Sequence, residues 1–379
     1  MITRFYRFEK EWNEPFDTSL DSETTFLLMF GEMGRDERLN RAIEEVCLAF
    51  PKALKGGCSG AGEIFGEQLF ENTLVVAVVR LEKSRVRKVD IPIASAEESK
   101  AVGRKVVESL LDDSLKSIFV LSEGLTINGS ELSVGINEVL PKGVNVTGGL
   151  AGDDDRFEKT YLLGQDCRVA SEVVTAFGFY GECFRSATGY RGGWDRFGVE
   201  RMITSSKKNI LYTLNEEPAL DVYRRYLGKY AQGLPASGLL FPLAVRASKE
   251  SDETKVRTIL AIDEKERSIT FAGDIPEGGY ATFMKANFDR LIDGAYEAAS
   301  MMTEGVHIDG SALSIAISCV GRKLVLKERT EEELEAICDV LPEGTGQIGF
   351  YSYGEISLMS TGTCDLFNQT MTLTLMWEE

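Results

Sequence analysis

The sequence predicts an α/β protein, with α+β as the alternative class, built as two related lobes of mixed sheets with flanking helices. Strand-like apolar runs and amphipathic helical stretches mix along all 379 residues, which favours this class. One strand–helix–proline–glycine pattern occurs three times, which indicates a duplicated supersecondary unit. The length suffices for two domains or for one large core made of merged halves.

Each copy of the pattern runs from an apolar strand through a short helix and a proline to a glycine turn that carries an acid. The strands are residues 26–30, 118–121 and 313–317. The copies are neither contiguous nor evenly spaced along the chain, so a solenoid is not expected. The acids that end the three copies are Glu63, Asp153 and Glu355.

The other elements follow in chain order. Residues 1–22 form an N-terminal arm, and the β-branched run 73–79 predicts a buried strand. Ser95 and Glu98 have the spacing of a capping box, which opens a helix through residue 110. Further strands are expected at 160–163, 173–177, 209–214, 240–245, 258–262 and 369–377, and helices at 219–230 and 288–299.

The composition excludes several classes of protein. The net charge of −18 disfavours binding to nucleic acid and to anionic membranes. No apolar run approaches the roughly 20 residues that span a bilayer, and the N-terminus has no signal-peptide pattern. We therefore expect a cytoplasmic protein.

The cysteines point to a reducing compartment. Their number is seven, none forms a CxxC pair, and a disulfide framework is not expected. Cys47 and Cys338 lie on predicted helices, where a small buried thiol is the ordinary role. With His307 as the single histidine, a zinc site is not expected.

These landmarks resemble the FIST family of sensory proteins, which combine an N-terminal and a C-terminal FIST domain. The resemblance covers nearly the whole chain. On it, residues 23–210 are the FIST N-terminal domain and residues 211–379 the FIST C-terminal domain, with the boundary near residues 205–216. The strings that carry it are residues 57–63, 148–153, 218–223, 318–322, 349–356 and 368–373.

The resemblance implies a bacterial-type sensor of a small polar ligand, with an amino acid or related carboxylate as the usual proposal. Members work beside histidine kinases, chemoreceptors or cyclic-dinucleotide enzymes, so output in trans to such a partner is expected here. Some relatives are haem-based sensors of nitric oxide. The family commonly has a histidine where this chain has Phe367, which weakens the haem interpretation and leaves His307 as the available imidazole.

We expect the ligand to lie in a cleft between the lobes. Arg322 suits bidentate capture of a carboxylate, or forms a structural salt bridge. Cys319 is a pocket wall, a reactive thiol or a small core residue. Tyr351 and Tyr353 line the pocket around the ligand's side chain, or they pack against residues of neighbouring strands.

The glycine turns and their acids complete the predicted site. Backbone amides of the turns and the acids Glu63, Asp153 or Glu355 would hold an ammonium group; alternatively, the glycines are tight turns and the acids bind local backbone N–H groups. No cofactor and no metal are predicted, with haem as an alternative. An enzyme that uses Cys319 is the rival class of function. The turn residues in question are Gly57, Ser59, Gly60, Gly148 and Gly149.

Overall fold

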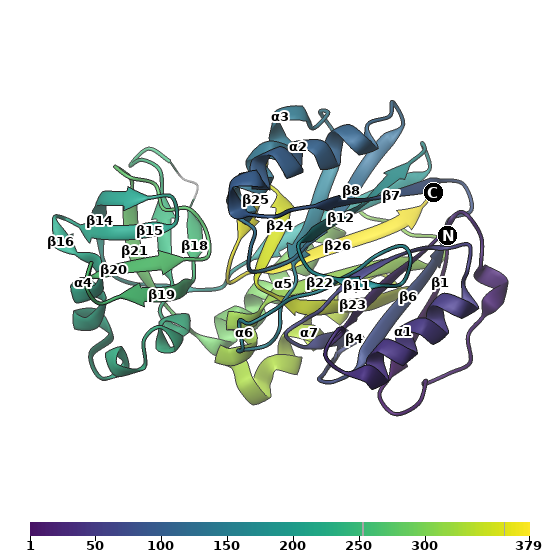
Figure 1. The fold of residues 1–379 in the computed structure, drawn as a ribbon, viewed down its shortest axis with the longest axis horizontal. Helices are drawn as coiled ribbons and strands as arrows, with labels where there is room; N and C mark the ends of the chain where they lie inside the picture. The colour runs from purple at the N-terminus through teal and green to yellow at the C-terminus, as the bar shows by residue number, and fades with distance from the viewer. Residues whose placement is uncertain (252–253, 360) are drawn as a thin grey trace.

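The computed structural model describes residues 1–251, 254–359 and 361–379, arranged as a large lobe and a small lobe (Figure 1). The large lobe contains three mixed sheets, and the small lobe contains residues 195–285. The predicted α/β class with mixed sheets, flanking helices and two lobes is confirmed, but all three repeated units lie in the large lobe, so the lobes are not the related copies that the sequence predicted. Among the described residues, no helix has the length and apolar character needed to cross a membrane.

The first sheet has the strand order β1-β6-β2-β3-β10-β11, and its β2 and β3 are parallel. Helix α1 (Glu37–Ala49) makes the crossover between them, and Asp36 caps it by accepting a hydrogen bond from the Arg38 amide. The strands are β1 (Ile2–Phe8), β2 (Thr25–Gly31), β3 (Leu54–Cys58), β6 (Leu74–Arg80), β10 (Leu162–Leu163) and β11 (Val169–Ala170).

The second sheet has the order β25-β24-β9-β8-β12-β7, with β8 and β9 parallel. Helices α2 (Ser99–Leu110) and α3 (Gly129–Val139) pack against each other above it (Figure 1). Ser95 makes no capping hydrogen bond, and Glu98 instead accepts one from the Ala94 amide, so the predicted capping box is not formed. The strands are β7 (Arg85–Pro92), β8 (Leu115–Ser122), β9 (Asn145–Leu150), β12 (Val173–Tyr180), β24 (Gly354–Leu358) and β25 (Cys364–Phe367).

The third sheet has the order β13-β26-β22-β23-β4-β5, with β22 and β23 parallel. Helix α5 (Phe288–Thr303) precedes β22, and α6 (Val320–Leu326) and α7 (Thr330–Cys338) follow it. The strands are β4 (Glu63–Phe65), β5 (Gln68–Phe70), β13 (Phe184–Arg191), β22 (Ala312–Cys319), β23 (Thr345–Ser352) and β26 (Met371–Glu378).

The three repeated units exchange their glycine-turn strands in a cycle. Strand β4 leaves the first unit and pairs with β23, β24 leaves the third unit and pairs with β9, and β10 leaves the second unit and pairs with β3. Each unit therefore completes the sheet of another, and the inner faces of the three sheets share one apolar core. That core includes Phe26, Phe30, Phe119, Leu121, Ile315, Ile317 and Phe350.

A glycine recurs at the same place in each unit because two parallel strands approach closely there. A Cβ on Gly57, Gly148 or Gly349 would lie 1.9, 1.8 or 1.8 Å from a carbonyl oxygen of the neighbouring strand. No side chain fits at that distance. This close approach explains why positions 57 and 148 are glycines, independently of any ligand.

The small lobe is a curved antiparallel sheet in the order β18-β17-β21-β14-β15-β20-β19, inserted between β13 and α5 of the third unit. Helix α4 (Ala219–Leu227) packs its apolar face into this sheet and is shorter than the predicted 219–230. The strands are β14 (Asp195–Lys207), β15 (Ile210–Leu214), β16 (Glu217–Pro218), β17 (Leu243–Arg246), β18 (Lys255–Arg257), β19 (Ile259–Asp263), β20 (Ser268–Phe271) and β21 (Tyr280–Lys285).

Cys47 is not the free thiol that the sequence predicted. It forms a disulfide with Cys167, 120 positions away, with the two Cα atoms 6.4 Å apart. The bond ties α1 of the first unit to the turn between β10 and β11, which the second unit contributes to the first sheet. Spacing did not suggest this pair because the two cysteines meet through the strand exchange.

Candidate functional site

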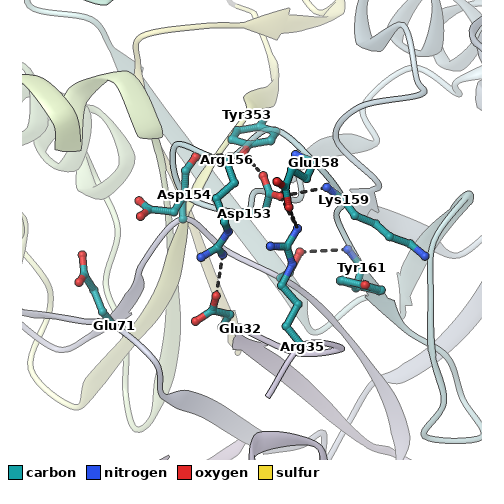
Figure 2. Close-up of polar contacts among 12 residues, drawn as sticks. Glu32, Arg35, Glu71, Asp153, Asp154, Arg156, Glu158, Lys159, Tyr161 and Tyr353 are labelled. Atoms are coloured by element: carbon teal, nitrogen blue, oxygen red, sulfur yellow. Dashed lines mark hydrogen bonds and ion pairs between the residues drawn. The ribbon is translucent and has the colours of Figure 1, made fainter. Parts of the chain in front are cut away.

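The segment 153–159 is a charged loop that follows β9, and Asp153 holds its shape. The Asp153 carboxylate accepts hydrogen bonds from the backbone amides of Glu158 and Lys159, at 3.0 and 2.9 Å. It also accepts one from the Tyr353 hydroxyl and pairs with Arg35 at 2.9 Å. Figure 2 shows these groups converging on Asp153 from three parts of the chain.

Two more ion pairs fix the charged loop to the first unit. Arg156 pairs with Glu32 at 2.6 Å, and Arg35 reaches Glu158 at 3.4 Å (Figure 2). The side chains fill the space between them and leave no volume for a water molecule there. The cluster is therefore a clamp on the loop rather than a cavity for a ligand.

The clamp presents Phe157 to the space between the lobes. Its ring stacks on Tyr353 with the centroids 4.5 Å apart and the planes 13° from parallel. Phe157 has φ 52°, a conformation that bulky L-residues rarely adopt, and its side chain is 40% exposed. Such a residue needs its surroundings to hold it, and the hydrogen bonds of Asp153 do so.

Phe157 and Tyr353 line a cleft of about 440 Å³ between the two lobes, here called the inter-lobe cleft. Leu125 of the large lobe and Leu260 of the small lobe also line it, at 38% and 44% exposure. Exposed apolar side chains that line one cleft are typical of a binding surface. Its volume suits a small molecule.

Charged and polar groups surround the apolar part of the inter-lobe cleft. Lys208 reaches it from the turn between β14 and β15, and its ammonium makes no ion pair or hydrogen bond with any described residue. Glu97 lies on the large-lobe side. Its own backbone N–H, the Ser95 hydroxyl and the Lys208 charge lower the pKa of the Glu97 carboxyl. Asn128, Thr126 and Asn209 add amide and hydroxyl groups.

Tyr353, which the sequence predicted to bind the ligand, lines the inter-lobe cleft. Its hydroxyl donates a hydrogen bond to Asp153, another residue of the predicted site. The Ser59 hydroxyl accepts a hydrogen bond from the Tyr161 backbone amide at 3.0 Å, which is a structural contact. Gly60 and Glu63 border a cavity of about 60 Å³ that opens beside Arg156 and Lys323. Burial raises the pKa of Glu63 to about 8, although the Thr73 hydroxyl donates to it at 3.2 Å.

Arg322 is fully buried and paired inside the third unit. Its guanidinium lies 2.7 Å from Glu333 and also donates to the Leu291 carbonyl at 2.8 Å. Tyr351 donates its hydroxyl to the same glutamate at 2.7 Å. Of the two interpretations of Arg322, the salt bridge is the one that the structure contains, and carboxylate capture stays a prediction that requires this pair to open.

Cys319 and Glu355 lie in the same buried region, and Gly149 packs in the sheets. Burial strongly raises the pKa of the Cys319 thiol, which disfavours the thiolate that a nucleophile needs. Glu355 accepts hydrogen bonds from Ser352 at 2.7 Å and from Thr370. A Cβ on Gly149 would lie 2.9 Å from the Ile317 side chain. Glu63, Asp153 and Glu355 thus occupy three different environments.

The haem and metal predictions concern His307 and any group of side chains that could bind a metal ion. His307 is exposed in the segment between α5 and β22. No group of three or more His, Cys, Asp and Glu side chains in the described part of the chain is placed to hold a metal ion. The haem alternative stays a prediction.

Sequence reasoning missed Phe157, Leu125, Leu260, Lys208 and Glu97. Phe157 carried a usable signal, since it is a single aromatic residue inside a run of charged ones from Asp153 to Lys159. The other four come from separate loops and strands, and nothing local marks them. Their common position arises from the packing of the small lobe onto the large one.

Models of two domain families match the chain. The FIST N domain matches residues 25–217, and the FIST C domain matches residues 219–357. The chain belongs to the FIST family. FIST domains are sensory domains of signal transduction, so the predicted family and its general role are confirmed.

No curated protein sequence matches this FIST chain. A solved chorismatase is similar at 11% identity and a TM-score of 0.36, over 99% of this chain and 98% of that one. A cyanuric acid hydrolase from A. caulinodans is similar at 9% identity and a TM-score of 0.19, over 78% of this chain and 99% of that one. At these TM-scores, neither protein informs the chemistry of the FIST chain.

Proposed function

We propose that this FIST protein senses a free amino acid or a related small carboxylate in the inter-lobe cleft and signals in trans. The observation that carries the proposal is the composition of the cleft. An unpaired Lys208 on one lobe faces Glu97 and an apolar, aromatic wall on the other. A sensor needs a specific small-molecule site, and this cleft combines enclosed apolar area with a few polar groups.

The two charges match the head group of an amino acid. The Lys208 ammonium would bind the carboxylate and the Glu97 carboxylate would bind the α-ammonium, both by charge-assisted hydrogen bonds. The side chain would then lie against Leu125, Phe157, Tyr353 and Leu260. This arrangement replaces Arg322 as the carboxylate partner, since Arg322 is already paired with Glu333.

A ligand in this position contacts both lobes, which gives it a means of changing the protein's shape. Several of the contacts between the lobes are polar: Arg257 donates to the Leu366 carbonyl at 3.1 Å, Lys255 pairs with Asp365, and Asn128 donates to Asp274 at 3.3 Å. A ligand that binds the closed arrangement better shifts the population toward it. A histidine kinase, chemoreceptor or cyclic-dinucleotide enzyme would bind the altered surface.

We place the protein in the cytoplasm, where such partners have their signalling domains. In that compartment the Cys47–Cys167 pair would be held as thiols, since cytosolic disulfides are rare. The redox state of this pair in cells therefore tests the proposed compartment.

The proposal is tested by a thermal-shift screen against amino acids and small carboxylates, followed by calorimetry on each hit. A ligand at 100 times its Kd adds about 2.7 kcal/mol of stability, which visibly raises the melting temperature. Lys208→Ala should weaken binding by about 10-fold to 100-fold, the value of a hydrogen bond to a charged group. Lys207→Ala, at the exposed last residue of β14, is the matched control and should bind normally.

Two results would count against the proposal. A screen without any hit on well-folded protein would remove amino-acid and carboxylate sensing. A hit that binds Lys208→Ala as tightly as the original protein would move the site out of the inter-lobe cleft.

A further inference from the structure

We infer that the ligand of the inter-lobe cleft carries a planar aromatic or heteroaromatic ring, which stacks on Phe157, beside its carboxylate. This inference rests on the proposed function and names the class of ligand more narrowly. It starts from a stacked pair of aromatic rings at the surface of a cleft, Phe157 and Tyr353.

The stack leaves Phe157 partly exposed in the wall of the inter-lobe cleft. Tyr353 covers one face of its ring, since the rings lie 13° from parallel with the centroids 4.5 Å apart. Tyr353 itself is 8% exposed and Phe157 is 40% exposed, so the open aromatic surface of the pair belongs to Phe157. A flat ring that stacks there would extend the pair to three layers.

The protein holds Phe157 in place at a cost. A left-handed backbone conformation is unfavourable for a non-glycine residue, and Phe157 has φ 52°. Four groups on Asp153 secure the loop: two backbone amides, Arg35 and the Tyr353 hydroxyl. The hydrogen bond from the Tyr353 hydroxyl to Asp153 therefore fixes both the charged loop and the Tyr353 ring on which Phe157 stacks. A pre-positioned ring loses little entropy when a second ring binds it.

The charges orient such a ligand across the cleft. Lys208 places a positive charge on the small-lobe side, whereas the buried Arg257 guanidinium interacts with the charges of Asp274 and Asp365 and donates to the Leu366 carbonyl. Gly273, which lines the cleft, lets the guanidinium lie directly behind that wall, since a Cβ on it would be 2.9 Å from the Arg257 guanidinium carbon. A ligand whose ring lies against Phe157 and whose anionic group points toward Lys208 fits this arrangement of aromatic surface and charge.

Aliphatic side chains are also stabilised by contact with apolar walls, so burial alone does not favour a ring. The stacking geometry of the ring provides the distinction. A stacked aromatic pair contributes about 0.5–1.5 kcal/mol beyond the area that it buries, a preference of roughly 2-fold to 10-fold. A puckered ring of the same size buries similar area without parallel stacking. The comparison of a flat ring with a puckered one isolates this contribution.

The experiment is calorimetry with matched pairs of acids: phenylacetate against cyclohexylacetate, and phenylalanine against cyclohexylalanine. We expect the flat member of each pair to bind about 2-fold to 10-fold more tightly. Phe157→Leu should remove this preference while keeping carboxylate binding, and Phe157→Trp should keep the preference. Phe288→Leu, at another exposed phenylalanine of the large lobe outside the cleft, should change nothing.

The outcomes separate this inference from the proposed function. Equal binding of flat and puckered acids, or a flat-ring preference that survives Phe157→Leu, overturns the ring while the carboxylate sensor stands. Failure of every acid to bind folded protein overturns the proposed function, and the inference with it. Loss of the preference in Phe157→Leu, with normal folding and retained carboxylate binding, supports both.

Discussion

Glu63 and Glu355 each place a carboxyl group in the interior of the large lobe, with hydroxyl partners rather than a cation in direct contact. Thr73 donates to Glu63, and Ser352 and Thr370 donate to Glu355. Burial raises the pKa of Glu63 to about 8 and that of Glu355 to about 7, from an ordinary value of 4.5. These acids are therefore held protonated across part of the neutral range.

The raised pKa values predict how stability depends on pH. Between pH 4.5 and about 8 the folded chain keeps a proton on Glu63 that the unfolded chain has lost. The free energy of unfolding therefore falls as the pH rises through this window, by at most about 1.4 kcal/mol per pH unit for one group. Glu63→Gln mimics the protonated acid and should show a smaller fall.

Denaturant unfolding at pH 5, 6, 7 and 8 measures this difference. Glu44→Gln, at an exposed position of α1, is the control and should keep the original pH dependence. Parallel curves for the original protein and Glu63→Gln would show that Glu63 does not retain its proton in the folded state.

At the scale of elements, the strand exchange makes each unit depend on another. The hairpin of β10 and β11 belongs to the second unit in sequence but extends the first sheet. This hairpin is short, so few backbone hydrogen bonds hold it, and the Cys47–Cys167 disulfide joins it to α1. The disulfide therefore reinforces a junction between two units.

Removal of this disulfide should destabilise the protein. Cys47→Ser is expected to lower the free energy of unfolding by about 2–5 kcal/mol, because the cross-link restricts the unfolded chain. Dithiothreitol should lower the melting temperature of the original protein to about that of Cys47→Ser. It should leave the melting temperature of Cys47→Ser unchanged. Cys338→Ser, at a free half-buried cysteine, controls for the loss of a thiol.

Thiol titration gives an independent measure of the same bond. Protein that is oxidised in air after purification and then unfolded without reductant should show five reactive thiols, the free cysteines at 58, 183, 319, 338 and 364. Seven reactive thiols in protein purified without reductant would show that Cys47 and Cys167 are not joined.

At the scale of the whole molecule, the two lobes are joined by two chain crossings, by polar contacts, and by an apolar cluster in which Ala244 and Met284 of the small lobe pack with Leu291 and Leu326 of the large lobe. The chain enters the small lobe after β13 and leaves it after β21 (Figure 1). Interfaces between domains of one chain permit relative motion unless they are large and mostly apolar. The inter-lobe cleft lies where such motion would open and close a ligand site.

Ligand binding should therefore make the molecule more compact. A saturating acid from the screen is expected to lower the radius of gyration measured by small-angle X-ray scattering. Lys208→Ala, measured at the same ligand concentration, should keep the ligand-free value. An unchanged radius in original protein that calorimetry shows to be saturated would mean that signalling does not proceed through lobe closure.

The sequence by itself determined the repeated units, the mixed class, the glycine positions and the FIST family. Apolar periodicity, proline and glycine act over a few residues, so these features are local and can be predicted. The place of Tyr353 in the wall of a cleft could also be predicted, because it lies within the glycine-containing string 349–356.

Only the tertiary structure decided which partners these residues meet. Arg322 has the same chemistry whether it binds a ligand or Glu333, and the buried pair settled that its partner in the fold is Glu333. Cys47 met Cys167, and Phe157 met Tyr353, because strands and loops far apart in sequence pack together. Burial and pairing depend on such long-range contacts, which no local pattern encodes. The inter-lobe cleft exists for the same reason, since neither lobe contains it alone.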